Sequence, residues 1–128
     1  VARGLGEVIT FPGRIPYAEA SRWLGLGTVA VSPKRSLTEA NGKLLNYMAC
    51  GLPVVASDTP VNRELLGEHG VYASVGDAEA FALRIGELLD HPTHARARGG
   101  ALRRRAETRF AWPALAERLE DVYREALE

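Results

Sequence analysis

The residues best suited to chemistry in this chain lie in a polar stretch that follows an apolar segment. After residues 28–32, a loop leads to Asn41, Gly42 and Lys43, which open a segment with helical spacing. The first turn of a helix has N–H groups without intrahelical partners and the positive end of the helix dipole. Gly42 leaves room for a ligand, and the Lys43 ammonium adds a charge. We therefore predict that this turn binds a diphosphate.

This turn differs from the best-known phosphate loop. A Walker A loop needs a fixed glycine spacing and a Ser or Thr after its lysine, and both are absent here. The alternative reading of Lys43 is a solvent-exposed lysine on a helix.

The order of apolar segments predicts the elements that position this turn. Strand-like segments are expected at 8–11, 28–32, 53–57 and 70–74. Segment 53–57 shows no alternation of polar residues, which is typical of a parallel strand buried on both faces. Helices are expected over 16–24, 41–49, 61–66, from a cap at Asp77 through Leu89, over 92–109, and from Trp112 or Pro113 to the end.

This alternation predicts an α/β fold, a Rossmann-like parallel sheet flanked by helices. Ligands bind at the carboxyl ends of the strands in such sheets, which is where the Gly42 turn follows its strand. The two C-terminal helices have no strand after them and are expected to pack across the sheet or to reach another domain. Phe110 and Trp112 are expected to dock against the core or against that domain.

Composition narrows the class of protein. The chain has 128 residues, 46% of them hydrophobic, which suits one domain with one core. Its 16 basic residues balance 16 acidic ones, which argues against a nucleic-acid-binding protein and against a disordered chain. The single cysteine, Cys50, is read as a small buried residue. No signal peptide or apolar run of about 20 residues is present, so we expect a cytoplasmic protein.

Metal and membrane binding have weaker support in the sequence. His69, His91 and His94 lack the Cys or acid spacing of a metal site and are expected at the surface. No Asp-x-Asp triplet is present, so neither a metal nor another cofactor is predicted. A basic run is either a solvated helix face, which we favour, or a peripheral contact with anionic lipid at the inner face of the membrane; it comprises Arg96, Arg98, Arg103, Arg104 and Arg105.

The block EANGKLLNYMACGLPVVA, residues 39–56, resembles the donor-site signature of family 4 (group 1) glycosyltransferases. Three flanking segments are similar too. Residues 11–16 resemble the preceding strand and its glycine loop, 62–66 the segment after the next strand, and 110–112 the Phe-x-Trp before the last helix. The resemblance covers nearly the whole chain.

The resemblance implies a fold, a reaction and a set of partners. The chain would be part of the C-terminal, nucleotide-sugar-binding domain (1–128) of a GT-B enzyme of carbohydrate biosynthesis. The acceptor domain, the catalytic His or acid and an Arg/Lys pair on the phosphates would lie upstream of Val1, so the chain alone is expected to be inactive. The enzyme would move a sugar, with retained anomeric configuration, from a nucleotide diphosphate to an acceptor hydroxyl on a glycan, lipid or small molecule.

Two positions, one in the block and one just before it, replace a pair of glutamates that the family places eight positions apart. The second glutamate contacts the donor ribose, and its position holds Asn46; the first position holds Thr38. An asparagine can donate to and accept from ribose hydroxyls, but without charge the contact is weaker. A family variant with Lys-Leu-x-x-Tyr-Met matches residues 43–48, so Leu44 joins the expected donor-binding set.

Three further residues complete the expected site. Glu39 replaces the first acid near the donor sugar if the loop shifts by one residue, and it is the one candidate catalytic residue. Gly13, in the glycine loop, and Arg14 belong to the expected donor-binding set, and Arg14 is expected to flank the base. A solvated surface position is the alternative for Glu39, Asn46 and Arg14.

Two other functions remain open from the sequence. One is a nucleotide-sugar epimerase or a glycogen-synthase-like transferase on the same fold. The other is a degenerate, non-catalytic domain that binds a partner, which the altered pair of acids favours.

Overall fold

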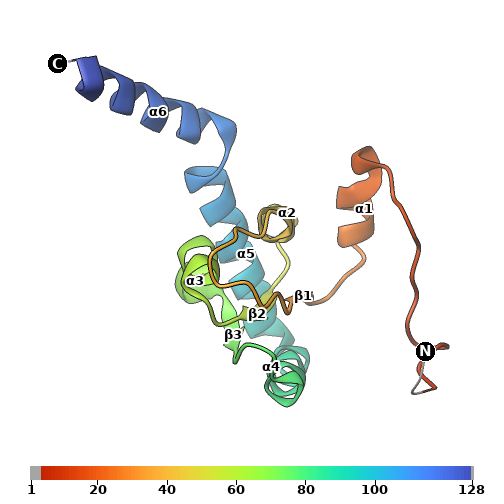
Figure 1. The fold of residues 1–128 in the computed structure, drawn as a ribbon. Helices are drawn as coiled ribbons and strands as arrows, with labels where there is room; N and C mark the ends of the chain where they lie inside the picture. Colours follow the sequence, from red (N-terminus) through yellow and green to blue (C-terminus); the bar gives the residue numbers. More distant parts are fainter. Residues whose placement is uncertain (1–3, 128) are drawn as a thin grey trace.

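A parallel sheet of three strands organises the chain, as a computed structural model of residues 4–127 shows. The strands are β1 (Ala30–Ser32), β2 (Val54–Ser57) and β3 (Val71–Ala73), in the order β1-β2-β3 (Figure 1). Ala30 lies opposite Val54, and Val55 lies opposite Val71. All four residues of β2 are buried, as predicted for a central parallel strand. The predicted α/β fold class is confirmed.

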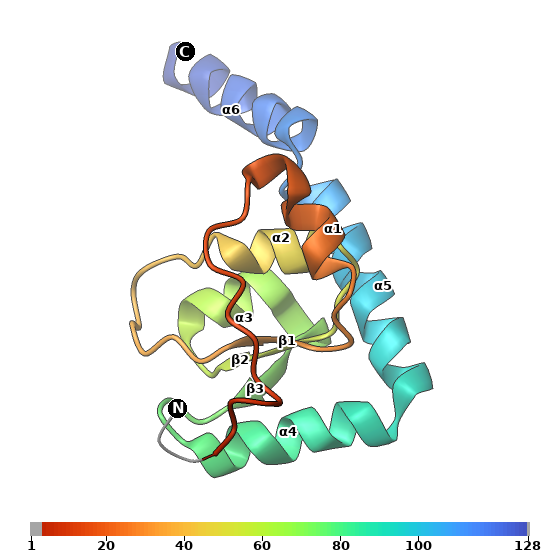
Figure 2. The ribbon, with the colours of Figure 1, turned by 90° about the vertical axis from the view of Figure 1, so that its right-hand side faces the viewer.

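Helices cover both faces of this sheet (Figure 2). One face packs against α2 (Lys43–Ala49), α3 (Pro60–Leu66) and the later part of α5 (Pro92–Arg109). The other face packs against α4 (Ala78–Asp90) and the beginning of α5. Helix α5 therefore crosses from one face to the other, as expected for a helix without a following strand.

Local sequence signals fix the ends of the central helices. Thr59 caps α3, its Oγ1 accepting from the N–H of Asn62 at 3.2 Å, and Pro60 follows in the first turn. Asp77 caps α4 as predicted, because its Oδ1 accepts from the N–H of Ala80 at 2.9 Å. A short 3-10 helix, η2 (Gly67–His69), then leads from α3 to β3.

Helix α5 fits closely against the turn between α2 and β2. A Cβ added at Gly99 would lie 2.0 Å from the carbonyl oxygen of Gly51, so only glycine fits there. Gly51 itself has φ +69°, a conformation that glycine adopts without steric cost. Among the described glycines, Gly99 shows the closest approach to a neighbouring backbone segment.

Two arginines of the basic run bind main-chain carbonyls, one at the end of α3 and the other in η2. Arg105 donates to the carbonyls of Leu65 and Glu64, both at 2.8 Å, and Arg98 donates to that of Glu68 at 3.1 Å. The last carbonyls of a helix have no intrahelical partner, so Arg105 completes the end of α3, while Arg98 binds the short helix that follows. The basic run is therefore not one uniform solvated face.

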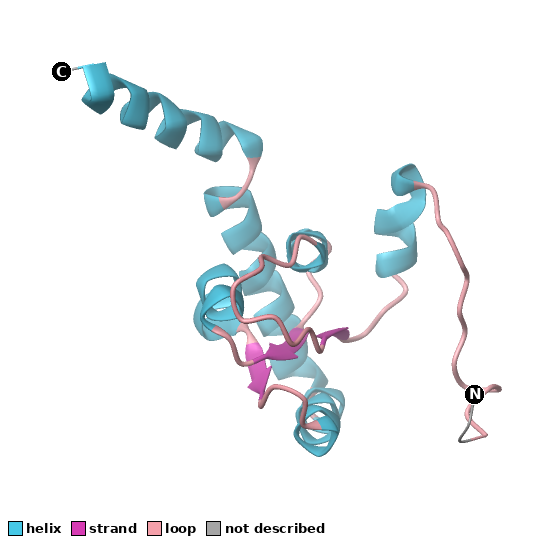
Figure 3. Ribbon diagram, viewed as in Figure 1, coloured by secondary structure: helices cyan, strands magenta, loops and turns pink. Residues whose placement is uncertain are grey.

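The predicted strand at 8–11 is wrong. Among the described residues this segment pairs with no strand, and Figure 3 shows it as loop. Val8 and Phe11 are 78% and 79% exposed. A strand is stable only when its backbone groups are paired, so β propensity alone does not make one. The following helix is confirmed as η1 (Tyr17–Glu19) and α1 (Ala20–Leu24).

The last helix, α6 (Trp112–Leu127), projects from the end of α5 (Figure 1). None of its residues is buried, and Trp112 is 84% exposed, so Trp112 does not dock on this core. The other alternative, docking against another domain, stays a prediction. Phe110 does pack against the core, and so does the half-buried Cys50. Across residues 4–127, no helix combines the length and apolarity needed to span a bilayer.

Candidate functional site

The predicted site lies in the loop from Ser32 to Lys43, at the carboxyl end of β1. Inside this loop, Lys34 Nζ lies 2.7 Å from Glu39 Oε2, and the Glu39 N–H donates to Ser36 Oγ at 3.3 Å. The hydrogen bond from Lys34, with its charge, lowers the pKa of the Glu39 carboxyl. Glu39 is therefore an ionised side chain with a cationic partner already in place.

A buried hydrogen bond anchors the far end of the loop. Asn41 Nδ2 donates to Ser32 Oγ, and both residues are buried, with exposed fractions of 7% and 0%. The carbonyl of Asn41 then accepts from the N–H of Leu44 at 2.9 Å. Asn41 thus fixes the first turn of α2 to the last residue of β1, and its side chain is structural here.

The turn at Gly42 and Lys43 is open to solvent. Both residues are exposed, and a Cβ added at Gly42 would meet no heavy atom within 4 Å. Gly42 has φ −53°, which any residue adopts, so its backbone does not demand glycine. The N–H groups of Leu44 and Leu45 are bonded to Asn41 and Gly42. Within residues 4–127, the N–H groups of Gly42 and Lys43 have no such acceptor.

Asn46 shares a face of α2 with Lys43, because residues three apart on a helix are neighbours. It is exposed and lines a cavity of about 280 Å³ between α1 and α2. The rest of that lining is mostly apolar and includes Tyr17, Leu24, Ala49 and Cys50. Thr38 is exposed in the loop. Lys43 and Asn46 thus present a cation and an amide along one side of a short helix.

Three of the predicted residues do not join this cluster. The Leu44 side chain has no exposed area and packs in the core, so it presents no surface to a ligand. Gly13, with φ +74°, and the exposed Arg14 lie in the extended segment before η1. That segment stands apart from the sheet and from the loop (Figure 1).

The structure adds residues that the sequence did not single out. Arg35 reaches the turn after β3, because a Cβ at Gly76 would lie 2.7 Å from its Nη2. Ser57, at the carboxyl end of β2, has a buried Oγ without a hydrogen-bond partner in the described part of the chain. The sequence could have pointed to these two residues only as single polar residues near the ends of predicted strands. Whether such residues come close together depends on the order of the strands in the sheet, which the sequence does not show.

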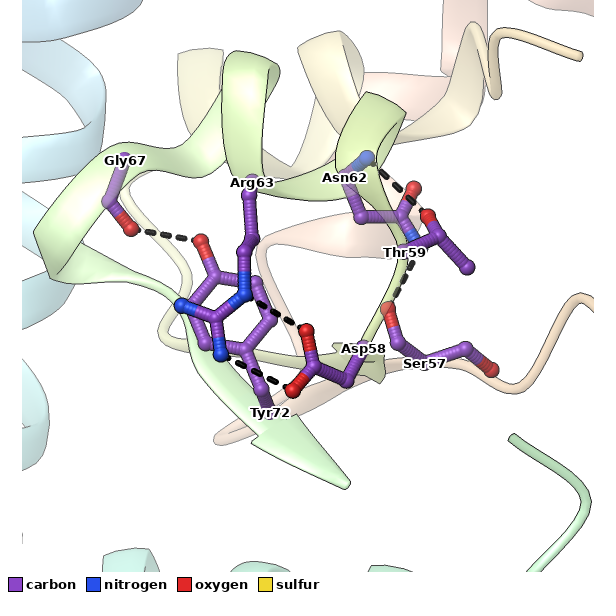
Figure 4. A network of polar contacts seen from close by, with 7 residues as sticks. All are labelled: Ser57, Asp58, Thr59, Asn62, Arg63, Gly67 and Tyr72. Carbon is purple, nitrogen blue, oxygen red and sulfur yellow. Dashed lines mark hydrogen bonds and ion pairs between the residues drawn. The ribbon is translucent and has the colours of Figure 1, made fainter. Parts of the chain in front are cut away.

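A polar network surrounds the start of α3, just after the carboxyl end of β2 (Figure 4). Arg63 binds both carboxylate oxygens of Asp58, at 2.6 and 2.8 Å, and its guanidinium lies 4.4 Å from the centre of the Tyr72 ring. Asn62 Nδ2 donates to the carbonyl of Ser57 at 2.8 Å. Hydrogen bonding to Arg63 lowers the pKa of Asp58, while burial raises that of Tyr72.

Comparison with known proteins identifies the family. The family model for glycosyl transferases group 1 matches residues 1–91. The chain belongs to this family. It is 35% identical over 129 residues to D-inositol 3-phosphate glycosyltransferase of Thermobispora bispora, covering 98% of this chain and 29% of that protein. It is 34% identical over 119 residues to alpha-maltose-1-phosphate synthase of Mycolicibacterium smegmatis, covering 86% of this chain and 30% of that protein.

A solved structure of a related protein gives the same picture for the fold. Sucrose-phosphate synthase from Thermosynechococcus elongatus superposes with a TM-score of 0.85 at 30% identity, over 96% of this chain and 31% of that one. The fold of this chain is therefore the fold of the matching part of that protein. The chain spans about 30% of the length of the relatives it matches.

The three histidines of this chain lie in two places. His69 belongs to η2, and His91 and His94 lie at the start of α5. His91 and His94 are exposed and His69 is half-buried. In residues 4–127, no cluster of three or more His, Cys, Asp or Glu side chains has the arrangement of a metal site.

Proposed function

We propose that this chain is the nucleotide-sugar-binding domain of a glycosyltransferase, with the acceptor held by another part of the protein. The observation that carries the proposal is the open turn at Gly42 and Lys43. It lies at the carboxyl end of a parallel strand and is held there by the buried Asn41–Ser32 bond. Relatives that are named as transferases and synthases support the same reading.

The chemistry of the turn suits a leaving diphosphate. When the sugar departs, negative charge grows on the diphosphate, and preorganised N–H groups with a nearby cation stabilise that charge without rearrangement. The N–H groups of Gly42 and Lys43 and the Lys43 ammonium supply these elements. We expect Asn46, on the same face of α2, to bond the ribose hydroxyls.

Glu39 has a narrower role in this proposal. Lys34 engages its Oε2, which leaves Oε1 as an acceptor for a hydroxyl of the donor sugar. A carboxylate held by a lysine keeps its charge and its orientation, so it suits binding better than proton transfer. The reaction proposed is transfer with retention to an acceptor hydroxyl on a glycan, lipid or small molecule, in the cytoplasm and without a metal.

Nucleotide titration tests this proposal. We would titrate UDP, GDP and ADP by calorimetry into the full-length protein, into a Lys43→Ala variant and into an Arg96→Ala variant, which removes an exposed cation from α5. Loss of a charge-assisted phosphate contact should weaken binding of the preferred nucleotide about tenfold or more in Lys43→Ala alone. Unchanged affinity for all three nucleotides in Lys43→Ala would remove Lys43 from the site.

Product analysis separates the transferase from its alternatives. The full-length protein, incubated with its donor, should release nucleoside diphosphate in step with transfer of sugar to an acceptor. Isomerised donor sugar in the absence of transfer would instead indicate an epimerase. The names of the relatives do not favour either the epimerase or the non-catalytic reading.

A further inference from the structure

A second polar cavity lies along the outer edge of β3, at the side of the sheet away from β1. Its volume is about 670 Å³, and it is bordered by α3, the end of α4 and the beginning of α5. Gly70, Val71 and Leu88 form its less polar lining. Clefts that hold small molecules usually have volumes of about 300–1,000 Å³, so this one suits such a ligand.

Charged and polar side chains dominate the rest of the lining. Three arginines, two histidines and two carboxylates converge on this space from different elements; they are Asp58, Arg63, Arg84, Glu87, His91, His94 and Arg98. Assembly from α3, α4 and α5 explains why no sequence motif marks this cavity.

The two carboxylates are each neutralised by an arginine. Arg63 binds Asp58 through two hydrogen bonds, and Arg84 Nη1 lies 3.0 and 2.9 Å from the two oxygens of Glu87. These four residues contribute no net charge. The imbalance comes from Arg98, whose one hydrogen bond to the described chain goes from Nη1 to the neutral carbonyl of Glu68.

Two histidines, His91 and His94, line the same cavity as that unbalanced guanidinium. No hydrogen bond within residues 4–127 involves the side chain of His91 or His94. Arg98 and His94 also line an adjoining cavity of about 470 Å³, together with His69 and one acid, Glu68. The positive end of the α5 dipole lies at His91 and His94 as well, since α5 begins at Pro92.

We propose that this cavity binds a small hydroxylated phosphate monoester, with its phosphate on Arg98, His91 and His94. A guanidinium presents N–H donors in a fork that matches phosphate oxygens. The arginine-bound carboxylates of Asp58 and Glu87 retain lone pairs that accept from hydroxyl groups. The ligand class thus follows from a cationic end and two acceptors in one cavity of small-molecule size.

This site is independent of the proposed donor site. Lys43 and Asn46 follow β1, at one edge of the sheet, whereas the cavity borders β3, at the other edge. None of the residues expected to bind the nucleotide sugar lines it. A ligand in this cavity would act as a regulator or as part of a second substrate, and not as the leaving diphosphate.

Calorimetric titration of the full-length protein tests the proposal with sn-glycerol 3-phosphate, inorganic phosphate, glycerol and acetate as probes. We expect glycerol 3-phosphate to bind more tightly than inorganic phosphate, and glycerol and acetate not to bind measurably. Arg98→Ala should weaken glycerol 3-phosphate about tenfold or more, the usual cost of a charge-assisted hydrogen bond. His94→Gln should weaken it less.

Two controls give the result its meaning. Arg104→Ala removes an exposed arginine of the same helix that does not line the cavity. The affinity of this variant for glycerol 3-phosphate should therefore stay within about twofold of the parent's. Lys43→Ala should leave glycerol 3-phosphate binding unchanged, which separates this site from the donor site. If Arg98→Ala melts early because the Glu68 contact is lost, His94→Gln still tests the site. Equal losses in Arg98→Ala and Arg104→Ala, or no binding by the intact protein, would overturn the proposal.

Discussion

The two edges of the sheet use polar residues in opposite ways. Beyond β1, one buried bond between Asn41 and Ser32 holds a loop whose next two residues, Gly42 and Lys43, are open to solvent. Beyond β3, most charged groups bind one another or a main-chain carbonyl, as Arg63 binds Asp58 and Arg98 binds the carbonyl of Glu68. The first edge leaves the donors of this turn open to solvent, whereas the second edge engages most of its charged groups within the chain. The two edges of one three-stranded sheet therefore differ in how many of their polar groups are already paired within the chain.

Packing of α5 against the turn before the central strand β2 should give the largest effect. Gly99→Ala places a Cβ 2.0 Å from the Gly51 carbonyl, where only backbone movement relieves the clash. We expect a loss of about 3 kcal/mol or more in the free energy of unfolding, at the upper end of overpacking effects. Urea unfolding followed by circular dichroism measures it.

Gly100→Ala is the matched control for this change. Its new Cβ would have Arg104 Nη1 as its nearest neighbour, at 3.7 Å, an ordinary contact. Replacing a helical glycine by alanine stabilises by up to about 1 kcal/mol. Equal destabilisation by the two substitutions would mean that helix α5 does not approach the Gly51 turn as described.

The buried bond at the β1 edge should give the next effect. Asn41→Ala leaves the Ser32 hydroxyl buried without its partner, which should cost about 1–3 kcal/mol of stability. Because Asn41 fixes the turn, nucleotide affinity should fall as well, although Lys43 is intact. Thermal melts and nucleotide titration of the same variant report the two effects separately.

Thr38→Ala provides a comparison in the same loop. Thr38 is exposed and takes part in no described hydrogen bond, so its loss should leave the melting temperature unchanged. A stable Asn41→Ala variant with unchanged nucleotide affinity would contradict the positioning role of Asn41, and the open edge would then need no buried anchor.

The sequence predicted the pattern of elements better than the contacts between them. The run at 53–57 and the cap at Asp77 depend on local residue order, and both are confirmed. The segment 8–11 has a strand's composition but no partner strand among the described residues, which local order does not reveal. Gly42 was expected to leave room for a ligand, and the turn at Gly42 is open to solvent. Ligand contacts there stay predictions.

Long-range contacts account for what the sequence did not predict at the sites. The Leu44 side chain was assigned to the donor site through a motif, yet its place on α2 faces the core. Asn41 was expected at a phosphate, which stays a prediction for its main chain, and its side-chain amide binds Ser32, nine residues earlier in the chain. The cavity at β3 is lined by both Arg63 and Arg98, which lie 35 positions apart in the sequence, so no local pattern of residues indicates that they meet.

The ion pair at the β3 edge should give the smallest effect, and that effect depends on pH. Hydrogen bonding to Arg63 lowers the pKa of Asp58 in the folded chain, so the pair stabilises the fold when the carboxylate is charged. Its contribution is complete above about pH 5, beyond the ordinary aspartate pKa, and is lost as the pH falls through the lower folded pKa. Asp58→Asn should therefore destabilise slightly at pH 7, and the difference from the parent should vanish in acid. Solvent screens these half-exposed side chains, so the effect should also shrink in salt.

Asp90→Asn, an exposed acid outside the described ion pairs, is the control and should show no such loss. A difference between Asp58→Asn and the parent that persists unchanged at pH 2 would show that Asp58 acts through its shape, and the contrast between the two edges would lose its electrostatic basis.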